Sequence, residues 1–273
     1  MKILKTTQEL IEYRNSLAGS VGLVPTMGAL HQGHISLIKN SVQNNDTTIV
    51  SVFVNPTQFL AGEDFQTYPN RHEADIKICQ VADVDALFMP TPEEMYFEEE
   101  PHIIAPSLKA YILEGKKRPK HFDGVLRVVL KLFNLTRPNN AYFGKKDAQQ
   151  LYIISNMVKT LFLPITINPC EIVRDENGLA LSSRNAYLND EEKQKALSLS
   201  SSLKIASKEI IQGNLNANQI KEKMLEEMSE IQVEYIAIVN REFEQIPTIE
   251  IRNSIILIAA KVGNTRLIDN MWI

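Results

Sequence analysis

The sequence predicts an α/β fold, a parallel sheet with helices on both faces, followed by a smaller C-terminal α+β domain. Strands and helices alternate over the first two thirds of the chain, which is typical of a parallel sheet. The segment TTIVSVFV at 47–54 is apolar without interruption, as in a strand covered on both faces. Beyond about residue 175, helices precede neighbouring strands instead of alternating with them. We therefore expect domains at 1–175 and 176–273, the second acting as a lid.

The elements of the first domain follow from local patterns. A helix over about 6–17 is predicted because Thr6 or Thr7 can cap it, with Glu9 close behind. Apolar spacing and β-branched runs then predict strand 21–24, helix 33–44, strand 47–54, helix 72–81, strand 85–89, helices near 107–115 and over 124–135, strand 141–143, helix 147–161 and strand 164–168.

A change of pattern separates the two domains. The stretch RDENGLALSSRN (174–185) contains an Asn-Gly turn signal and small polar residues, so we expect a loop or hinge there. The remaining segments predict helices 190–211 and 215–231 and strands 233–239, 254–262 and 265–273.

Composition limits the classes of function. The chain has 273 residues, of which 44% are apolar, enough for a packed core. No window is apolar enough to span a membrane, and the N-terminus lacks the apolar core of a secretory signal, so we expect a cytoplasmic protein. Its net charge of -4 disfavours nucleic acid as a partner and favours small molecules. Cys79 and Cys170 show no metal-binding spacing, so we expect buried, reduced thiols.

The stretch VPTMGALHQGH, Val24 to His34, runs from the first predicted strand into the helix that begins near Gly33. Ligands of open α/β sheets bind at the carboxyl ends of strands, and a helix N-terminus favours anions such as phosphate. Gly28 and Gly33 would let the backbone approach closely. His31 and His34 would share one helix face and could donate hydrogen bonds to phosphate oxygens. A glycine-rich turn with two solvent-facing histidines is the alternative, because the motif matches no standard nucleotide pattern.

Two further segments carry groups suited to phosphate. In AYFGKKDAQQ (141–150), again a strand running into a helix, Lys145 and Lys146 could neutralise phosphates and Asp147 could cap the helix. In the loop that ends LSSRN (181–185), Arg184 and two serine hydroxyls could close over a triphosphate. An ordinary capped helix and an ordinary turn are the alternatives.

The fourth segment, FVNPTQF (53–59), lies at the end of the strand over 47–54. Asn55 and Gln58 offer uncharged donors and acceptors, which suit the orientation of a hydroxylated organic acid. Pro56 at the end of the strand is the structural alternative for part of this pattern.

Taken together and in order, these pieces resemble the pantothenate synthetase (pantoate-β-alanine ligase) family. The resemblance covers most of 24–188 and is carried by PTMGALHQGH, FVNPTQF, EDFQTYP, RPKHFDGV, KLFNLTRPNNAYFGKKDAQQL and IVRDENGLALSSRNAYL. It implies a Rossmann-like first domain of the nucleotidyltransferase superfamily with its HxGH-type motif. It also implies an ATP-dependent ligation through a pantoyl adenylate, with pantoate, β-alanine and ATP as partners, Mg²⁺ as cofactor and a homodimeric assembly.

The resemblance also assigns residues by motif. His34 would be the catalytic residue, the family's proton donor. Gln58 and Gln150 would hold pantoate, with Gln58 also near β-alanine. The ATP site would comprise Met27, Gly28, Ala29, Leu30, His31, Gln32, Gly33, His34, Gly144, Lys145, Lys146, Asp147, Val173, Leu181, Ser182, Ser183 and Arg184. The ligands of Mg²⁺ stay open and are expected to be mainly ATP phosphates and water.

The sequence departs from the family at four places. Lys120 stands where glycine is usual, Arg127 stands where a small hydroxyl residue is usual, the expected arginine is displaced to Arg71, and no proline follows Tyr96. We expect Lys120 and Arg127 to be solvated, although positive charge near the substrate is the alternative.

Two other classes remain in competition. A nucleotidyltransferase acting on a phosphorylated cofactor precursor would need a cationic pocket for the second phosphate. A catalytically silent nucleotide-binding protein could use the same fold. An aminoacyl-tRNA synthetase is disfavoured, because the acidic balance and roughly 100 residues after the loop leave little for tRNA recognition.

Overall fold

The computed structural model describes residues 1–273, which form two compact units. Met1–Lys145 with Gln149–Glu171 form the first unit, and Lys146–Ala148 with Ile172–Ile273 form the second. Up to β6 the elements are β1 (Lys2–Leu4), α1 (Thr7–Ser16), β2 (Val21–Thr26), α2 (Gln32–Asn44), β3 (Thr47–Val52), the 3-10 helix η1 (Pro56–Gln58), α3 (His72–Val81), β4 (Ala86–Phe88), α4 (Pro92–Met95), α5 (Glu114–Lys117), α6 (His121–Thr136), β5 (Asn140–Gly144), the 3-10 helix η2 (Lys145–Asp147), α7 (Ala148–Thr160) and β6 (Thr166–Cys170).

The first unit is built on a six-stranded sheet in the order β1-β4-β3-β2-β5-β6, and every neighbouring pair is parallel. This confirms the predicted parallel sheet. From β2 the chain proceeds to β3 and β4 on one side and only later to β5 and β6 on the other. The strand order therefore reverses between β2 and β5, and open α/β sheets bind ligands at the carboxyl ends of strands at such a point.

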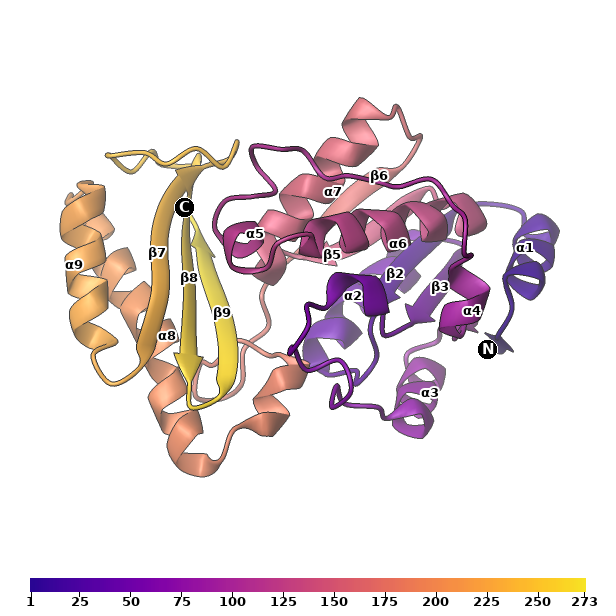
Figure 1. The fold of residues 1–273 in the computed structure, drawn as a ribbon, viewed down its shortest axis with the longest axis horizontal. Helices are drawn as coiled ribbons and strands as arrows, with labels where there is room; N and C mark the ends of the chain where they lie inside the picture. The colour runs from indigo at the N-terminus through magenta and orange to yellow at the C-terminus, as the bar shows by residue number, and fades with distance from the viewer. The chain divides into compact units, whose positions relative to one another are not determined.

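Helices cover both faces of this sheet, with α2 and α3 on one face and α6 and α7 on the other (Figure 1). Alternating strand residues supply the two cores because successive side chains point to opposite faces. Val24 and Val50 pack in one cluster with Leu37 of α2 and Cys79 of α3. Both cysteines are buried free thiols as expected, and burial raises the pKa of Cys79 to about 12.

The second unit is the expected small α+β arrangement. It contains the 3-10 helix η3 (Ser183–Tyr187), α8 (Asp190–Ile211), α9 (Ala217–Glu227), β7 (Gln232–Asn240), β8 (Ser254–Val262) and β9 (Thr265–Trp272). The three strands pair antiparallel in the order β7-β8-β9. One apolar cluster joins α8 and α9 to the sheet, including Leu199, Ile220 and Ile256. Across the chain, no helix combines the length and apolarity needed to cross a membrane.

The helix expected near 107–115 is wrong. Only Glu114–Lys117 is helical, and the preceding residues form turns. The side chain of Gln149 donates to the carbonyls of Lys109 and Ile112 and accepts from the Glu114 amide, so it replaces the bonds that a helix would make. Leu113, with a φ of 49° and a ψ of -113°, lies outside the helical region and interrupts helical geometry. The sequence pattern also missed β1 and α4, which are too short to show periodicity.

Helix α6 lies unusually close to η1 because of Gly124. A Cβ at Gly124 would lie 2.3 Å from the Thr57 carbonyl oxygen and 2.7 Å from the Gln58 nitrogen. The Gly124 carbonyl accepts a hydrogen bond from Asn55 Nδ2 at 3.0 Å. The only residue type that fits this contact is therefore glycine, and α6 fixes the position of the Asn55–Gln58 segment.

Lys120, immediately before α6, is exposed as expected but has a φ of 67°. A lysine at positive φ is strained where glycine is not. We therefore expect Lys120→Gly to raise the free energy of unfolding by about 0.5–1 kcal/mol, measured by urea denaturation. The control, Lys39→Gly on the exposed surface of α2, should lower it by about 1 kcal/mol. A loss at both positions would contradict the strain argument.

Candidate functional site

The turn between β2 and α2 is held by one buried carboxylate. Gly28 and Ala29 have φ values of 87° and 49°, so the chain reverses sharply after the strand. Asp75 on α3, which is 1% exposed, accepts hydrogen bonds from the Ala29 and Leu30 amides at 2.9 and 2.7 Å. These two bonds fix the turn at the carboxyl end of β2, where the sheet predicts a ligand.

The two histidines of this turn form the start of α2. His31 is the N-cap, and its Nδ1 accepts from the Gly33 amide at 3.1 Å. His34 Nδ1 accepts from the His31 amide at 3.3 Å, and the ring centroids lie 4.1 Å apart. Because each Nδ1 accepts a hydrogen bond, the neutral form of each ring carries its proton on Nε2. The pair thus lies together as expected, with Nε2–H as the donor of each ring.

Gln58 lies beside this turn in a network of amides. It is buried, and its Nε2 donates to the Met27 sulfur at 2.9 Å. Asn55 Nδ2 donates to Gln58 Oε1 at 3.1 Å. The segment after β3 and the segment after β2 therefore meet at the edge of the sheet, as the fold predicts for a ligand site.

A charged cluster supports the main chain at Gln58. Arg118 makes a bidentate ion pair with Glu63, through Nε at 2.6 Å and Nη2 at 2.7 Å. Burial acts to raise the pKa of Glu63, but the hydrogen bonds and charge of Arg118 outweigh it and lower that pKa. His121 Nδ1 donates to the Gln58 carbonyl at 2.7 Å, and its Nε2 accepts from Arg118 Nη1 at 3.0 Å. Burial and the Arg118 charge lower the pKa of His121 to about 4, so this ring is neutral at pH 7.

The segment after β5 carries the predicted GKKD group. Gly144 ends β5 beside β2, at the point where the strand order reverses. Lys145 forms an ion pair with Glu171. Of the two adjacent glutamines, Gln149 is 4% exposed and its bonds are used to hold the 109–114 backbone, whereas Gln150 is half-buried. Gln150 is therefore the candidate ligand of this pair.

In the second unit, the predicted loop is short and internally bonded. The Leu181 amide donates to the Val173 carbonyl at 3.0 Å, and Ser182 caps η3 by accepting from the Arg184 amide at 3.3 Å. At the start of this loop, Arg174 makes two hydrogen bonds to the buried carboxylate of Asp269, at 2.6 and 2.9 Å.

The Lys146–Ala148 segment is also held within the second unit. The Lys146 carbonyl accepts from Asn270 Nδ2 at 2.6 Å. The Lys146 ammonium lies 3.7 Å from Asp147, which precedes α7 directly.

Two arginines, Arg127 and Arg71, depart from the family pattern and lie in different surroundings. Arg127 is half-buried instead of solvated: it lies 3.3 Å from Glu100 and hydrogen-bonds His102 at 3.2 Å.

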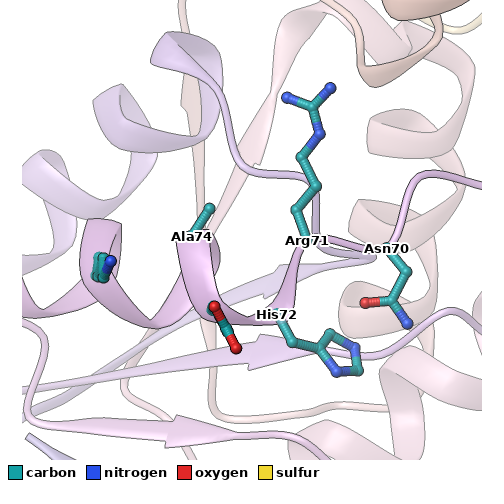
Figure 2. Close-up of a pocket in the computed structure, with 6 residues that line it drawn as sticks. Asn70, Arg71, His72 and Ala74 are labelled. Atoms are coloured by element: carbon teal, nitrogen blue, oxygen red, sulfur yellow. The ribbon is translucent and has the colours of Figure 1, made fainter.

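Arg71 lines a surface pocket at the start of α3 with Asn70, His72, Glu73, Ala74 and Lys77 (Figure 2). In Figure 2 the Arg71 side chain points away from those of Asn70 and His72, so these groups do not converge on one ligand atom.

Sequence reasoning missed the residues that support this site. Asp75, Tyr96, Arg118 and His121 act on segments far from them in the chain, so no local pattern marks them. The block RPKHFDGV contains Arg118 and His121, and its resemblance to the family is the signal in the sequence that points to them. No group of three or more His, Cys, Asp or Glu side chains is arranged to hold a metal ion.

We expect Asp75→Asn to lower the free energy of unfolding by about 1–3 kcal/mol. Each carboxylate oxygen of Asp75 accepts one backbone amide, whereas asparagine has a single, uncharged oxygen and would face the other amide with its own NH2 group. Urea denaturation measures this loss. Asp46→Asn is the control, because Asp46 also accepts from a backbone amide, that of Ser20 at 2.7 Å, but is exposed. Its loss should be clearly smaller, and equal losses would show that the β2–α2 turn does not depend on Asp75.

His121 should make stability depend on pH. Because its folded pKa of about 4 lies below the ordinary 6.5, the unfolded state binds the extra proton between these values. The contribution of the neutral His121 to the free energy of unfolding is therefore fully present above pH 6.5. It falls by about 3 kcal/mol as the pH approaches 4. His121→Asn, which retains a donor for the Gln58 carbonyl, should remove this loss in urea titrations at several pH values. The exposed His72→Asn should not, and an unchanged profile in His121→Asn would refute the assignment.

Known proteins resemble this chain over its full length. The family described as Pantoate-beta-alanine ligase matches residues 2–272. A pantothenate synthetase of Campylobacter fetus subsp. fetus is 60% identical over 100% of both chains. The crystal structure of pantothenate synthetase from Thermus thermophilus is 39% identical with a TM-score of 0.94, covering 100% of this chain and 99% of that one.

A Francisella tularensis pantoate-beta-alanine ligase, solved in complex with beta-gamma ATP and beta-alanine, is also similar. It is 40% identical with a TM-score of 0.84, covering 100% of this chain and 97% of that one. Full-length identity at this level, together with the matching fold, shows that the chain belongs to the pantoate-β-alanine ligase family, the pantothenate synthetases.

Proposed function

We propose that the protein condenses pantoate with β-alanine to form pantothenate, with cleavage of ATP. A pantoate carboxylate oxygen attacks the α-phosphorus, and the bond to the bridging oxygen breaks to release pyrophosphate. The β-alanine amine then attacks the acyl carbon of pantoyl adenylate, loses a proton and releases AMP. The observation that carries the proposal is the histidine turn beside the neutral amides of Asn55 and Gln58, where the strand order reverses.

We assign ATP to Met27–His34, Gly144–Asp147, Val173 and Leu181–Arg184. Attack at the α-phosphorus develops charge on its oxygens, and donors placed beforehand stabilise such charge. His34 meets this requirement because its Nδ1 is used by the His31 amide, which makes Nε2–H the donor for a phosphate oxygen. His31, with the same tautomer, supplies a second donor.

Pantoate is assigned to Gln58 and Gln150, with β-alanine also near Gln58. An uncharged amide suits the hydroxyl and carboxylate of this acid, which must attack as a nucleophile and should not be neutralised by a close cation. The guanidinium that contacts the Gln58 carbonyl, Arg118, is already paired with Glu63. This pairing counts against the alternative substrate with a second phosphate, which would require an available cation.

Three further features are part of the proposal. Mg²⁺ would be held mainly by ATP phosphates and water, in keeping with the lack of a preformed carboxylate or histidine cluster. A homodimer is supported by exposed apolar side chains between α4 and α5, namely Phe97, Ile104 and Leu108. A cytoplasmic location is consistent with two free thiols.

Exchange of labelled pyrophosphate into ATP tests the reaction. The protein should catalyse exchange only with pantoate and Mg²⁺ present, and should release AMP and pantothenate when β-alanine is added. His34→Ala should lower exchange by about 10²-fold, as for loss of one transition-state donor.

His34→Asn separates chemistry from helix capping. Asparagine retains an acceptor near the Nδ1 position for the His31 amide but lacks Nε2–H, so exchange should fall as in His34→Ala. Recovery of activity in His34→Asn would show that His34 acts only as a cap. Absence of pantoate-dependent exchange in the unmodified protein would refute the function itself.

A further inference from the structure

The amide of Asn55 is oriented by two backbone groups together with the hydroxyl of Tyr96. Its Oδ1 accepts from the Thr57 amide at 3.2 Å, and its Nδ2 donates to the Gly124 carbonyl at 3.0 Å. A reversed amide would place donor against donor and acceptor against acceptor. The second Nδ2 hydrogen must therefore point to Gln58 Oε1, which leaves Gln58 Nε2 as the outward donor, now directed at Met27.

Tyr96 completes this arrangement from the opposite side. Its hydroxyl donates to Asn55 Oδ1 at 2.6 Å, and the Thr57 hydroxyl donates to the same oxygen at 2.9 Å. Burial raises the pKa of Tyr96, so the hydroxyl is protonated and remains a donor at neutral pH. Asn55 is 1% exposed, so water has no access to replace the bond from Tyr96.

The Tyr96 ring is itself held by two cations of α6. Lys131 Nζ lies 4.7 Å and the Arg127 guanidinium 5.7 Å from the ring centroid, distances typical of cation–π contacts. Glu100 pairs with both cations and is 11% exposed at its side chain. The arginine that departs from the family pattern is thus part of the support of Tyr96.

We propose that Tyr96, held by Arg127 and Lys131, is a positioning residue that acts through Asn55 to present the Gln58 amide to the acid substrate as a hydrogen-bond donor. The inference rests on the proposed binding of pantoate at Gln58. A donor directed at this place suits an oxygen of a hydroxy acid carboxylate, whereas an amide turned the other way would repel it.

Tyr96→Phe tests the proposal, because it keeps the ring and its cation contacts and removes only the hydroxyl. The KM for pantoate in the exchange reaction should rise about 10-fold, corresponding to loss of one positioned hydrogen bond, while the KM for ATP changes less than about 2-fold. Arg127→Met, which keeps the stem and removes the charge, should raise the KM for pantoate by a smaller factor. Tyr142→Phe is the matched control: Tyr142 is buried, whereas Tyr96 is half-buried, but its hydroxyl is likewise bonded to an asparagine, Asn45 at 2.8 Å, and its loss should leave both values unchanged.

A double-mutant cycle distinguishes positioning from a general structural role. In the Gln58→Ala background, Tyr96→Phe should cause no further rise in the KM for pantoate. The same rise in both backgrounds, or a rise below about 2-fold in the native background, would overturn the proposal.

A spectroscopic measurement separates this inference from the proposed function. The side-chain amide resonances of Asn55 and Gln58 should shift in Tyr96→Phe and stay in place in Tyr142→Phe. If the unmodified protein shows no exchange but these resonances respond, the reaction is wrong and the positioning network stands. If exchange is normal and the resonances do not respond, the positioning role is wrong.

Discussion

The candidate site depends on the two hydrogen bonds that the Asp75 carboxylate accepts from the Ala29 and Leu30 amides. Successive amides point in one direction only when the backbone leaves its extended conformation, and in this turn the buried Asp75 carboxylate accepts from both of them. With this turn fixed, His31 becomes the N-cap of α2 and His34 follows one turn later. Helix α3 therefore determines the geometry of a motif that lies more than one element before it in the chain.

The same principle recurs in the side chains of the site. Each histidine uses Nδ1 to accept a backbone amide, so the other nitrogen has a defined protonation state. Gln58 is bonded through its oxygen to Asn55, so its nitrogen has a defined direction. His121 donates to the main chain and accepts from Arg118. In each case one polar atom is bonded within the fold, and this fixes the hydrogen-bonding character of the other.

Much of the fold was predictable because its signals are local. Helix His72–Val81 and strand Ser254–Val262 lie where apolar spacing predicts them. The histidine turn was located by its position after a strand, although its chemistry could be assigned only through the resemblance to a family. Asp75, Tyr96 and His121 escaped prediction because their partners lie 46, 41 and 63 residues away. The helix expected near 107–115 failed for the same reason, since Gln149 binds that backbone from a later helix.

The contact of Gly124 with the Thr57 carbonyl has a mechanical consequence. With no room for even one methyl group between α6 and η1, the helix and the Asn55–Gln58 segment cannot shift independently. Lys131 and Arg127 lie on the same helix and hold Tyr96 against that segment from another direction. The Gln58 amide is thus attached to α6, a helix of 16 residues, and its position is as rigid as the packing of that helix in the core.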